Sequence, residues 1–186
     1  PFFCFVSYVD PHDPYDPPAP YDTMFAAEDM PEPTPASWQE KGNPVLERSQ
    51  SPWGFEQVKD NPAVTKKLRA LHHGEIRFLD DQIARILTRL DDKGLLDNSY
   101  VVFTTDHGDM MADQGLISKG VKFYDKGIHC PLIVRGPGVE SSRQQRLVCG
   151  LDFFPTFCDW AEIANSNRPP LEGKSFAAKP MPEDNA

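Results

Sequence analysis

An aspartate and a histidine that could hold a metal ion leave an apolar run together, at Asp106 and His107. An ionised carboxylate and a neutral imidazole both bind divalent cations. Gly108 follows them and permits the sharp turn that would aim both side chains into one site. The apolar run before them, residues 100–105, predicts a strand, and open α/β sheets carry their sites at the carboxyl ends of strands.

A second apolar run, residues 2–9, ends in a similar way, at His12 within the sequence DPHDPY of residues 10–15. If 2–9 and 100–105 are parallel neighbours, His12 and Asp106 meet at one edge of the sheet. The alternative is that both motifs are ordinary turns after strands, because Asp, Pro and Gly favour turns.

A lysine, Lys119, could supply positive charge for an anionic substrate. It lies between Ser118 and Gly120, after the loop that begins at Asp106. A lysine in such a loop can hold an anion as a point charge. The alternative is a solvated lysine on the surface.

Two other groups of polar residues have the wrong spacing for a metal site. Asp106, Asp109 and Asp113 are three and four positions apart, which does not fit the alternating ligands of an EF-hand. His72 and His73 fall in a predicted helix, where adjacent side chains point about 100° apart. We interpret these two histidines as structural.

The element that must position these motifs is a long helix predicted over residues 62–93. Asn61 suits its N-cap, Pro62 its first position, and Gly94 its end. Its core-facing residues recur at steps of three and four and surround one glutamate: Leu68, Leu71, Glu75, Leu79, Ile83, Ile86 and Leu90.

The order of strand, helix and strand predicts an α/β fold, a layered sandwich with a mainly parallel (mixed) sheet. We expect the helix to pack on one face of this sheet through its leucine and isoleucine side chains. The expected strands lie near 2–9, 100–105 and 131–135. Weaker expectations are an edge strand at 147–150, a helical turn at 123–126 and a helix over 152–163.

Composition indicates a single globular domain of 186 residues, with 39% hydrophobic and 25% charged residues. A net charge of −9 with no basic run argues against a nucleic-acid partner or an anionic membrane. No apolar run has transmembrane length, and no signal peptide is visible. The proline-rich residues 10–62 predict a long functional loop, and 164–186 a surface tail.

The four cysteines are Cys4, Cys130, Cys149 and Cys158, and none has the spacing of a metal site. Each lies among apolar neighbours, which favours buried free thiols over the alternative of a disulfide.

Three segments, in order along the chain, resemble the sulfatases of the alkaline-phosphatase-like superfamily. They are residues 7–18 (SYVDPHDPYDPP), the stretch from Val102 through Gly120, and residues 130–138 (CPLIVRGPG). The helix containing EIRFLDDQIARIL and the segment LDFFPTFCDWAEI also resemble that family.

The resemblance implies roles for four residues. Asp106 and His107 match the second half of the family's metal site, for which calcium is the common ion and manganese, magnesium and zinc are alternatives. His12 matches a catalytic histidine that contacts the sulfate group and the leaving oxygen, and Lys119 matches a catalytic lysine that binds sulfate oxygens. A cation, an imidazole and an ammonium would thus surround the transferring group.

The chain departs from the family in its nucleophile. Sulfatases make a formylglycine from the Cys or Ser of a C/S-x-P-x-R motif, and this sequence contains no such motif. The family's early pair of metal-binding aspartates has no match either, since Asp80-Asp81 and Asp91-Asp92 lie in or near the long helix. We therefore expect residues 1–186 to be a partial, incomplete catalytic domain. Its formylglycine is expected only in the missing amino-terminal segment of the parent domain.

The leading hypothesis is a sulfuric ester hydrolase acting on a small-molecule or glycan sulfate ester, with this chain alone inactive. The first alternative is a phosphonate monoester or phosphodiester hydrolase of the same superfamily. An alternative of another class is a non-catalytic remnant that binds anions or a partner chain. The family is often periplasmic, secreted or lysosomal, and the sequence does not choose among these compartments.

Overall fold

The long helix α3, Pro62–Asp92, is the dominant element of the computed structural model, which describes residues 2–35, 61–119 and 123–177. The side chain of Asn61 accepts a hydrogen bond from the Val64 N–H at 3.3 Å, and Pro62 occupies the first turn. Gly94 follows the C-cap with φ +64, a left-handed conformation that favours glycine. The predicted helix and both of its ends are confirmed.

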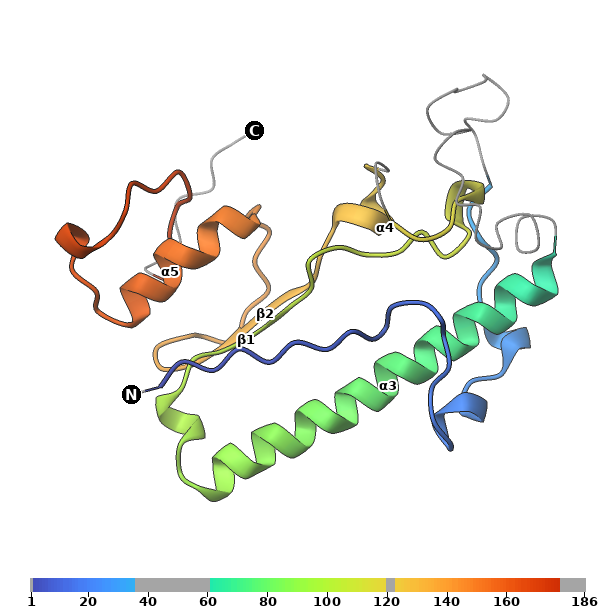
Figure 1. Ribbon diagram of the computed structural model, residues 1–186, viewed down its shortest axis with the longest axis horizontal. Helices are drawn as coiled ribbons and strands as arrows, with labels where there is room; N and C mark the ends of the chain where they lie inside the picture. The colour runs from blue at the N-terminus through green and yellow to red at the C-terminus, as the bar shows by residue number, and fades with distance from the viewer. Residues whose placement is uncertain (1, 36–60, 120–122, 178–186) are drawn as a thin grey trace.

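The other elements of the described residues are short (Figure 1). They are β1 Val101–Thr104, β2 Leu132–Arg135, α4 Asp125–Ile128, α5 Phe153–Trp160 and the 3-10 turns Tyr21–Thr23, Ala27–Asp29, Leu96–Asn98, Asp113–Gly115, Gly150–Asp152 and Asn165–Asn167.

Helix α3 is buried through its amino-terminal half, where it packs against the turns Tyr21–Thr23 and Ala27–Asp29. The approach is close, because a Cβ at Gly74 would collide with the Tyr21 carbonyl oxygen. The predicted packing of the apolar stripe on a sheet face is not seen. Leu79, Ile83 and Leu90 are only partly buried and Ile86 is exposed, since the described sheet has too little surface to cover them.

Strands β1 and β2 form the sheet, with Val101 opposite Arg135 and Thr104 opposite Leu132. The strands predicted near 100–105 and 131–135 are therefore confirmed. The pairing is antiparallel, however, so the described residues do not show the expected mainly parallel sheet.

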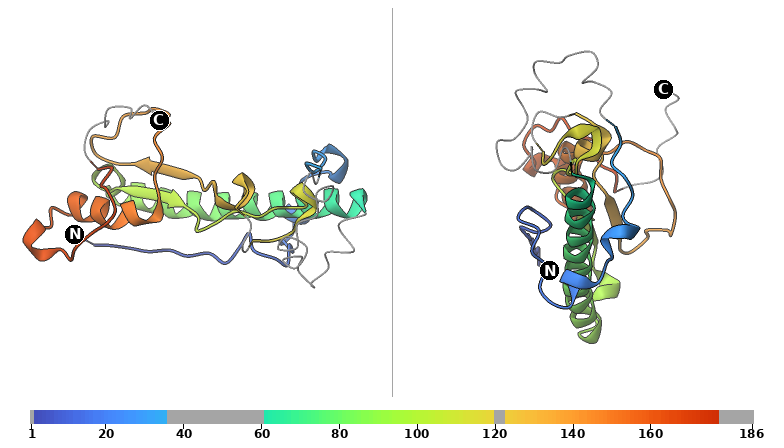
Figure 2. Two further views of the ribbon diagram at one scale, coloured as in Figure 1. Left: turned by 90° about the horizontal axis from the view of Figure 1, so that it is seen from above. Right: turned by 90° about the vertical axis from the view of Figure 1, so that its right-hand side faces the viewer.

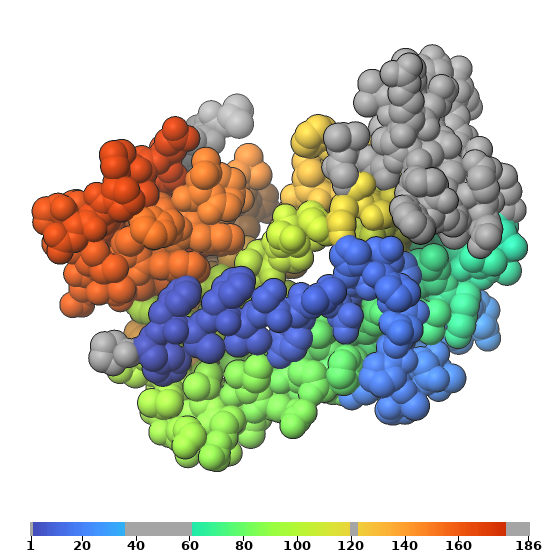
Figure 3. Space-filling model, viewed as in Figure 1, coloured from blue at the N-terminus to red at the C-terminus, as the bar shows by residue number. Residues whose placement is uncertain are grey.

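The prediction of a strand at 2–9 is wrong for this structure. The segment is extended and, in the view of Figure 1, passes in front of the space between α3 and the strand pair; it makes no ladder with either strand. Two further views and the space-filling picture show it lying along the outside of the molecule (Figures 2 and 3). Phe5 and Val9 are 81% and 84% exposed, because no neighbouring strand among the described residues covers them.

The carboxy-terminal part of the described chain packs around α5 through aromatic rings. Trp160 stacks on Tyr100 with ring centroids 4.4 Å apart, and Phe153 and Phe157 stack on each other. The backbone N–H of Phe176 donates to Thr156 Oγ1 at 3.0 Å, so the described end of the chain folds back on this helix. The edge strand expected at 147–150 does not form, and Leu147 is 94% exposed.

All four cysteines are free thiols, as predicted. Their predicted burial holds for Cys158, whereas Cys4 and Cys149 are exposed and Cys130 is intermediate.

Two further expectations concern the long loop predicted over residues 10–62 and helices that could span a membrane. Residues 36–60 of the predicted long loop lie outside the described residues. Among the helices that are described, none combines the length and apolar character needed to cross a bilayer.

Candidate functional site

The Asp106–His107 pair begins two residues after the end of β1 and has the geometry of two ligands for one cation. His107 Nδ1 lies 2.9 Å from the Gly108 carbonyl oxygen, which can only accept a hydrogen bond. Nδ1 therefore carries the proton of the neutral ring, and Nε2 keeps its lone pair. Nε2 is 3.6 Å from Asp106 Oδ2, so one ion could contact both atoms.

The Asp106 carboxylate is held in its charged form. Burial works to raise its pKa, but the charge of His107 when that ring is protonated, with hydrogen bonds from backbone N–H groups and the Thr105 hydroxyl, outweighs it, so the pKa lies below its usual value. The side chain is 85% exposed. An ionised, accessible carboxylate fits the role of a metal ligand.

The turn behind this pair is fixed by a close backbone approach. The Gly108 N–H donates to the Gly127 carbonyl oxygen at 2.9 Å, and a Cβ at Gly108 would collide with the Lys126 carbonyl oxygen. Only glycine allows the loop after β1 to lie this close to α4. The pair suits a divalent cation, but no group of three or more potential His, Cys, Asp or Glu ligands occurs in the described part of the chain.

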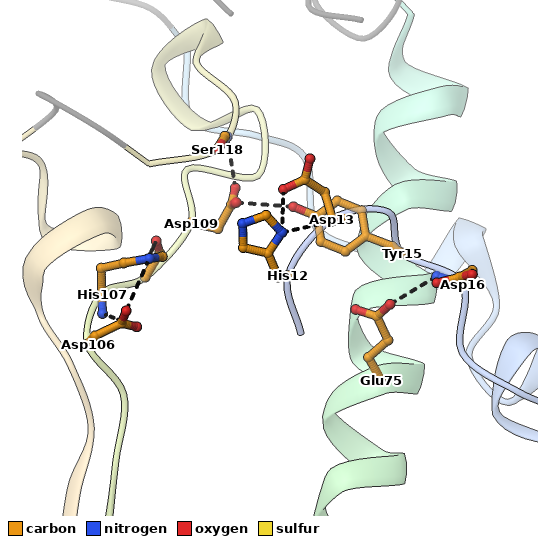
Figure 4. Close-up of polar contacts among 10 residues, drawn as sticks. His12, Asp13, Tyr15, Asp16, Glu75, Asp106, His107, Asp109 and Ser118 are labelled. Atoms are coloured by element: carbon orange, nitrogen blue, oxygen red, sulfur yellow. Dashed lines mark hydrogen bonds and ion pairs between the residues drawn. The ribbon is translucent and has the colours of Figure 1, made fainter. Parts of the chain in front are cut away.

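His12 lies at the tip of a tight turn that faces the Asp106 loop (Figure 4). Its backbone N–H donates to the Val9 carbonyl oxygen at 3.2 Å. Its Nδ1 lies 2.7 Å from the carbonyl oxygen of Asp13 and 3.0 Å from Oδ1 of the same residue. As in His107, this arrangement leaves Nε2 with its lone pair, and the side chain is 40% exposed.

A hydrogen bond that the sequence did not predict joins the His12 turn to the Asp106 loop. Tyr15 Oη donates to Asp109 Oδ2 at 3.1 Å (Figure 4). The other oxygen of Asp109 accepts from the backbone N–H groups of Met111 at 2.9 Å and Ser118 at 3.1 Å. Tyr15 and Asp109 belong to the same two motifs as His12 and Asp106, which was the only sequence signal for them.

A buried glutamate lies under the turn. Glu75 is 2% exposed and its Oε1 accepts from the Asp16 N–H at 2.9 Å, whereas Oε2 is buried without a hydrogen-bond partner among the described residues. Burial raises the pKa of Glu75 to about 7; the Asp16 N–H opposes this rise, and nearby aspartates, Asp10 first, add to it.

Lys119 directly follows Ser118 and is partly buried. Its neighbour's N–H bond to Asp109 brings its backbone to the same loop as Asp106 and His107. Its role as an anion ligand stays a prediction. The expected shared cleft also stays a prediction, and a cavity of about 290 Å³ is lined by other residues: Met110, Asp113, Gln114, Phe123, Tyr124, Asp125 and Lys126.

The sequence is similar to known hydrolases over most of its length. The sulfatase family model matches residues 1–163. An arylsulfatase of Clostridium perfringens is 33% identical over 171 residues, which are 88% of this chain and 34% of the relative. The multifunctional alkaline phosphatase superfamily protein PehA of Trinickia caryophylli is 28% identical over 99% of this chain and 39% of its own length.

The structure is similar to that of a phosphonate monoester hydrolase of Agrobacterium radiobacter. The TM-score is 0.81 at 28% identity, over 95% of this chain and 37% of the hydrolase. The similarity supports an alkaline-phosphatase-like fold at the coarse level, without confirming the layered sandwich in detail. The chain spans 34% and 39% of the two sequence relatives. With a family model matched along residues 1–163, the chain belongs to the sulfatase family.

Proposed function

We propose that the protein is a sulfuric ester hydrolase whose site includes His12, Asp106, His107 and Lys119. The observation that carries the proposal is the pairing of Asp106 Oδ2 with the free Nε2 of His107, 3.6 Å apart, in a loop bonded to the His12 turn. Membership of the sulfatase family supports the same reaction class.

Asp106 and His107 would hold a divalent cation, with calcium the first candidate and manganese, magnesium and zinc the alternatives. Such an ion, when bound, polarises an oxygen of the transferring group. Because the pair supplies two ligands, the remaining ligands of the ion would come from outside the described residues.

His12 and Lys119 would act on the ester itself. A neutral His12 can accept a hydrogen bond at Nε2, and after protonation it can donate to the departing alkoxide. Lys119 would place an ammonium beside the sulfate oxygens. Because the sequence contains no C/S-x-P-x-R motif, the proposal places the formylglycine nucleophile outside residues 1–186.

A phosphonate monoester hydrolase is the second candidate, favoured by the TM-score of 0.81 to an enzyme of that name. A sulfate monoester and a phosphonate monoester each carry one negative charge on a tetrahedral centre. The cation, imidazole and ammonium of the proposed site therefore suit both, and the choice rests on groups around the ester.

The test is a parallel assay of the full-length protein on p-nitrophenyl sulfate and p-nitrophenyl phenylphosphonate, with calcium and with manganese. The higher kcat/KM identifies the class of ester. We expect His12→Ala to lower kcat/KM roughly 10²- to 10⁴-fold, the usual contribution of a general acid.

His73→Ala is the matched control, because His73 is an exposed histidine whose Nδ1 bonds the Arg69 carbonyl oxygen within its own helix. It should keep wild-type activity. No hydrolysis of either ester by the wild type, or equal losses in the two variants, would contradict the proposed function.

A further inference from the structure

The carboxylate of Asp109 connects three segments of the candidate site. Oδ2 accepts from Tyr15 Oη, in the turn that carries His12. Oδ1 accepts from the N–H of Ser118, the residue before Lys119. Asp109 itself lies two positions after His107, so its backbone belongs to the loop of the proposed metal ligands.

We infer that Tyr15 and Asp109 are positioning residues that assemble this site, by bonding the His12 turn to the loop of Asp106 and His107 and to the segment of Lys119. The inference rests on the proposed function for its effect on catalysis. Whether Tyr15 and Asp109 hold the His12 turn in place can be measured separately, without an activity assay.

The Tyr15 arm is held as a neutral donor. Burial, together with the charge of Asp109 and its hydrogen bond, raises the pKa of the Tyr15 hydroxyl far above its usual value. The ring meets His72 of α3 edge to face, with centroids 5.4 Å apart at 85°. Burial lowers the pKa of His72, so the ring that supports Tyr15 is uncharged at neutral pH. Tyr15 is thus fixed between the long helix and Asp109.

The long-range hydrogen bonds of the His12 turn are made by residues that follow His12 in the sequence. Among the described residues, the hydrogen bonds of His12 run to Val9 and Asp13, within its own turn. The contacts with the rest of the molecule come at the next positions, from Tyr15 to Asp109 and from the Asp16 N–H to Glu75. The orientation of His12 toward the metal ligands therefore depends on these two anchors, of which only Tyr15 reaches the catalytic loop.

Tyr15→Phe is the first test, because it keeps the ring on His72 and removes only the hydroxyl. In the full-length protein we expect kcat to fall roughly 10- to 100-fold on the preferred p-nitrophenyl ester, with KM little changed, since misplacement of a reacting group by about 1 Å has effects of this size. Asp109→Ala should lose at least as much. Asp109→Asn keeps an oxygen for the Met111 and Ser118 N–H groups and can donate to Tyr15 Oη, so it should recover most of the loss.

The chain offers a matched control in Tyr21→Phe. Tyr21 Oη donates to Asp81 Oδ2 at 2.8 Å, which is also a tyrosine–aspartate bond made by the amino-terminal segment, but to a remote part of α3. This variant should keep the wild-type kcat. Thermal unfolding of both variants measures how much of each is folded, so that a fall in kcat can be separated from a loss of folded protein.

Histidine side-chain ¹H–¹⁵N spectra of the 186-residue chain provide a readout that does not need activity. In the wild type we expect one His12 signal set with the proton on Nδ1. Tyr15→Phe should shift or broaden it, and Tyr21→Phe should not. If the wild type hydrolyses neither ester, the proposed function fails and this spectrum alone decides the positioning role. Equal kcat values and equal His12 spectra in the two variants would overturn the inference.

Discussion

At the scale of single residues, the site combines groups that are readily recognised in sequence with groups that are not. Asp106, His107 and His12 stand at the ends of apolar runs, where polar side chains with ligand chemistry are conspicuous. Glu75 occupies a position of the apolar stripe of α3, and its periodicity indicates only that the position faces inward. Its bond to the Asp16 N–H depends on a turn 59 positions away, which no local pattern contains.

Glu75 should make the stability of the chain fall as the pH rises. Its pKa is about 7 in the folded state and ordinarily 4.5, so the folded chain holds this proton more tightly. The contribution is complete below about pH 4.5 and is lost as the pH rises through 7. Glu75→Gln should therefore be more stable than the wild type at pH 8 by on the order of 2 kcal/mol, since one pKa unit corresponds to about 1.4 kcal/mol.

Urea unfolding at pH 5 and pH 8 measures this difference, which should shrink at the lower pH. Glu28→Gln is the control, because Glu28 is exposed in the turn Ala27–Asp29. The same dependence on pH in wild type and Glu75→Gln would show that another group is responsible.

At the scale of elements, local signals predicted the long helix well, and contacts distant in sequence decided the rest. The N-cap, the first-turn proline and the terminal glycine of α3 act within a few residues, so the sequence shows them directly. The direction of strand pairing and the state of residues 2–9 depend on which neighbours are present. An apolar run alone cannot specify its partner. A parallel pairing of 2–9 with 100–105 was therefore expected, whereas the described strand pair joins Val101–Thr104 to Leu132–Arg135 and is antiparallel.

Arg69 links α3 to the loop after Asp109. Its guanidinium donates to the carbonyl oxygens of Pro31 and Met111 and pairs with Asp113 at 2.8 Å, with both side chains about nine-tenths buried. Arg69→Met should lower the free energy of unfolding by about 3 kcal/mol, because it leaves a buried carboxylate without its partner.

The matched control is Arg77→Met, on the same helix. Arg77 pairs with Asp81 at 2.7 Å but is 48% exposed, so its loss should cost less than about 1 kcal/mol. Chemical denaturation of the two variants tests the contrast, and similar losses would argue that Arg69 is not a fixed link.

The end of α3 allows a clean test of backbone conformation. A Cβ at Gly94 would meet nothing within 4 Å, but φ is +64 there. Gly94→Ala should therefore destabilise the chain by about 1 kcal/mol through the backbone alone. Gly150→Ala also adds a Cβ in open space, at a glycine without positive φ, and should change stability by less than about 0.5 kcal/mol. Thermal unfolding compares the two variants. Equal effects would contradict the positive φ of Gly94 as the cause of the destabilisation.

At the scale of the whole molecule, the proposed site supplies two of the ligands that a divalent cation would need. Calcium usually takes six to eight oxygen-type ligands. We expect the 186-residue chain alone to bind calcium weakly in titration calorimetry and to leave p-nitrophenyl sulfate unhydrolysed. Asp106→Asn should remove the remaining binding, whereas Asp80→Asn, on the exposed face of α3, should not. Turnover by this chain alone that His12→Ala abolishes would reveal a nucleophile among these residues.

The exposed segment 2–9 has a consequence for the solution behaviour of the chain. Its sequence, FFCFVSYV, contains no charge, proline or glycine, and such short segments of high β-propensity are prone to stack into fibrils. A synthetic peptide of these residues should raise thioflavin T fluorescence, and Phe5→Lys should prevent it. In the 186-residue chain, the same substitution should slow concentration-dependent precipitation, because Phe5 is 81% exposed and its replacement leaves no cavity. During synthesis, early covering of this segment would then protect the protein from self-assembly.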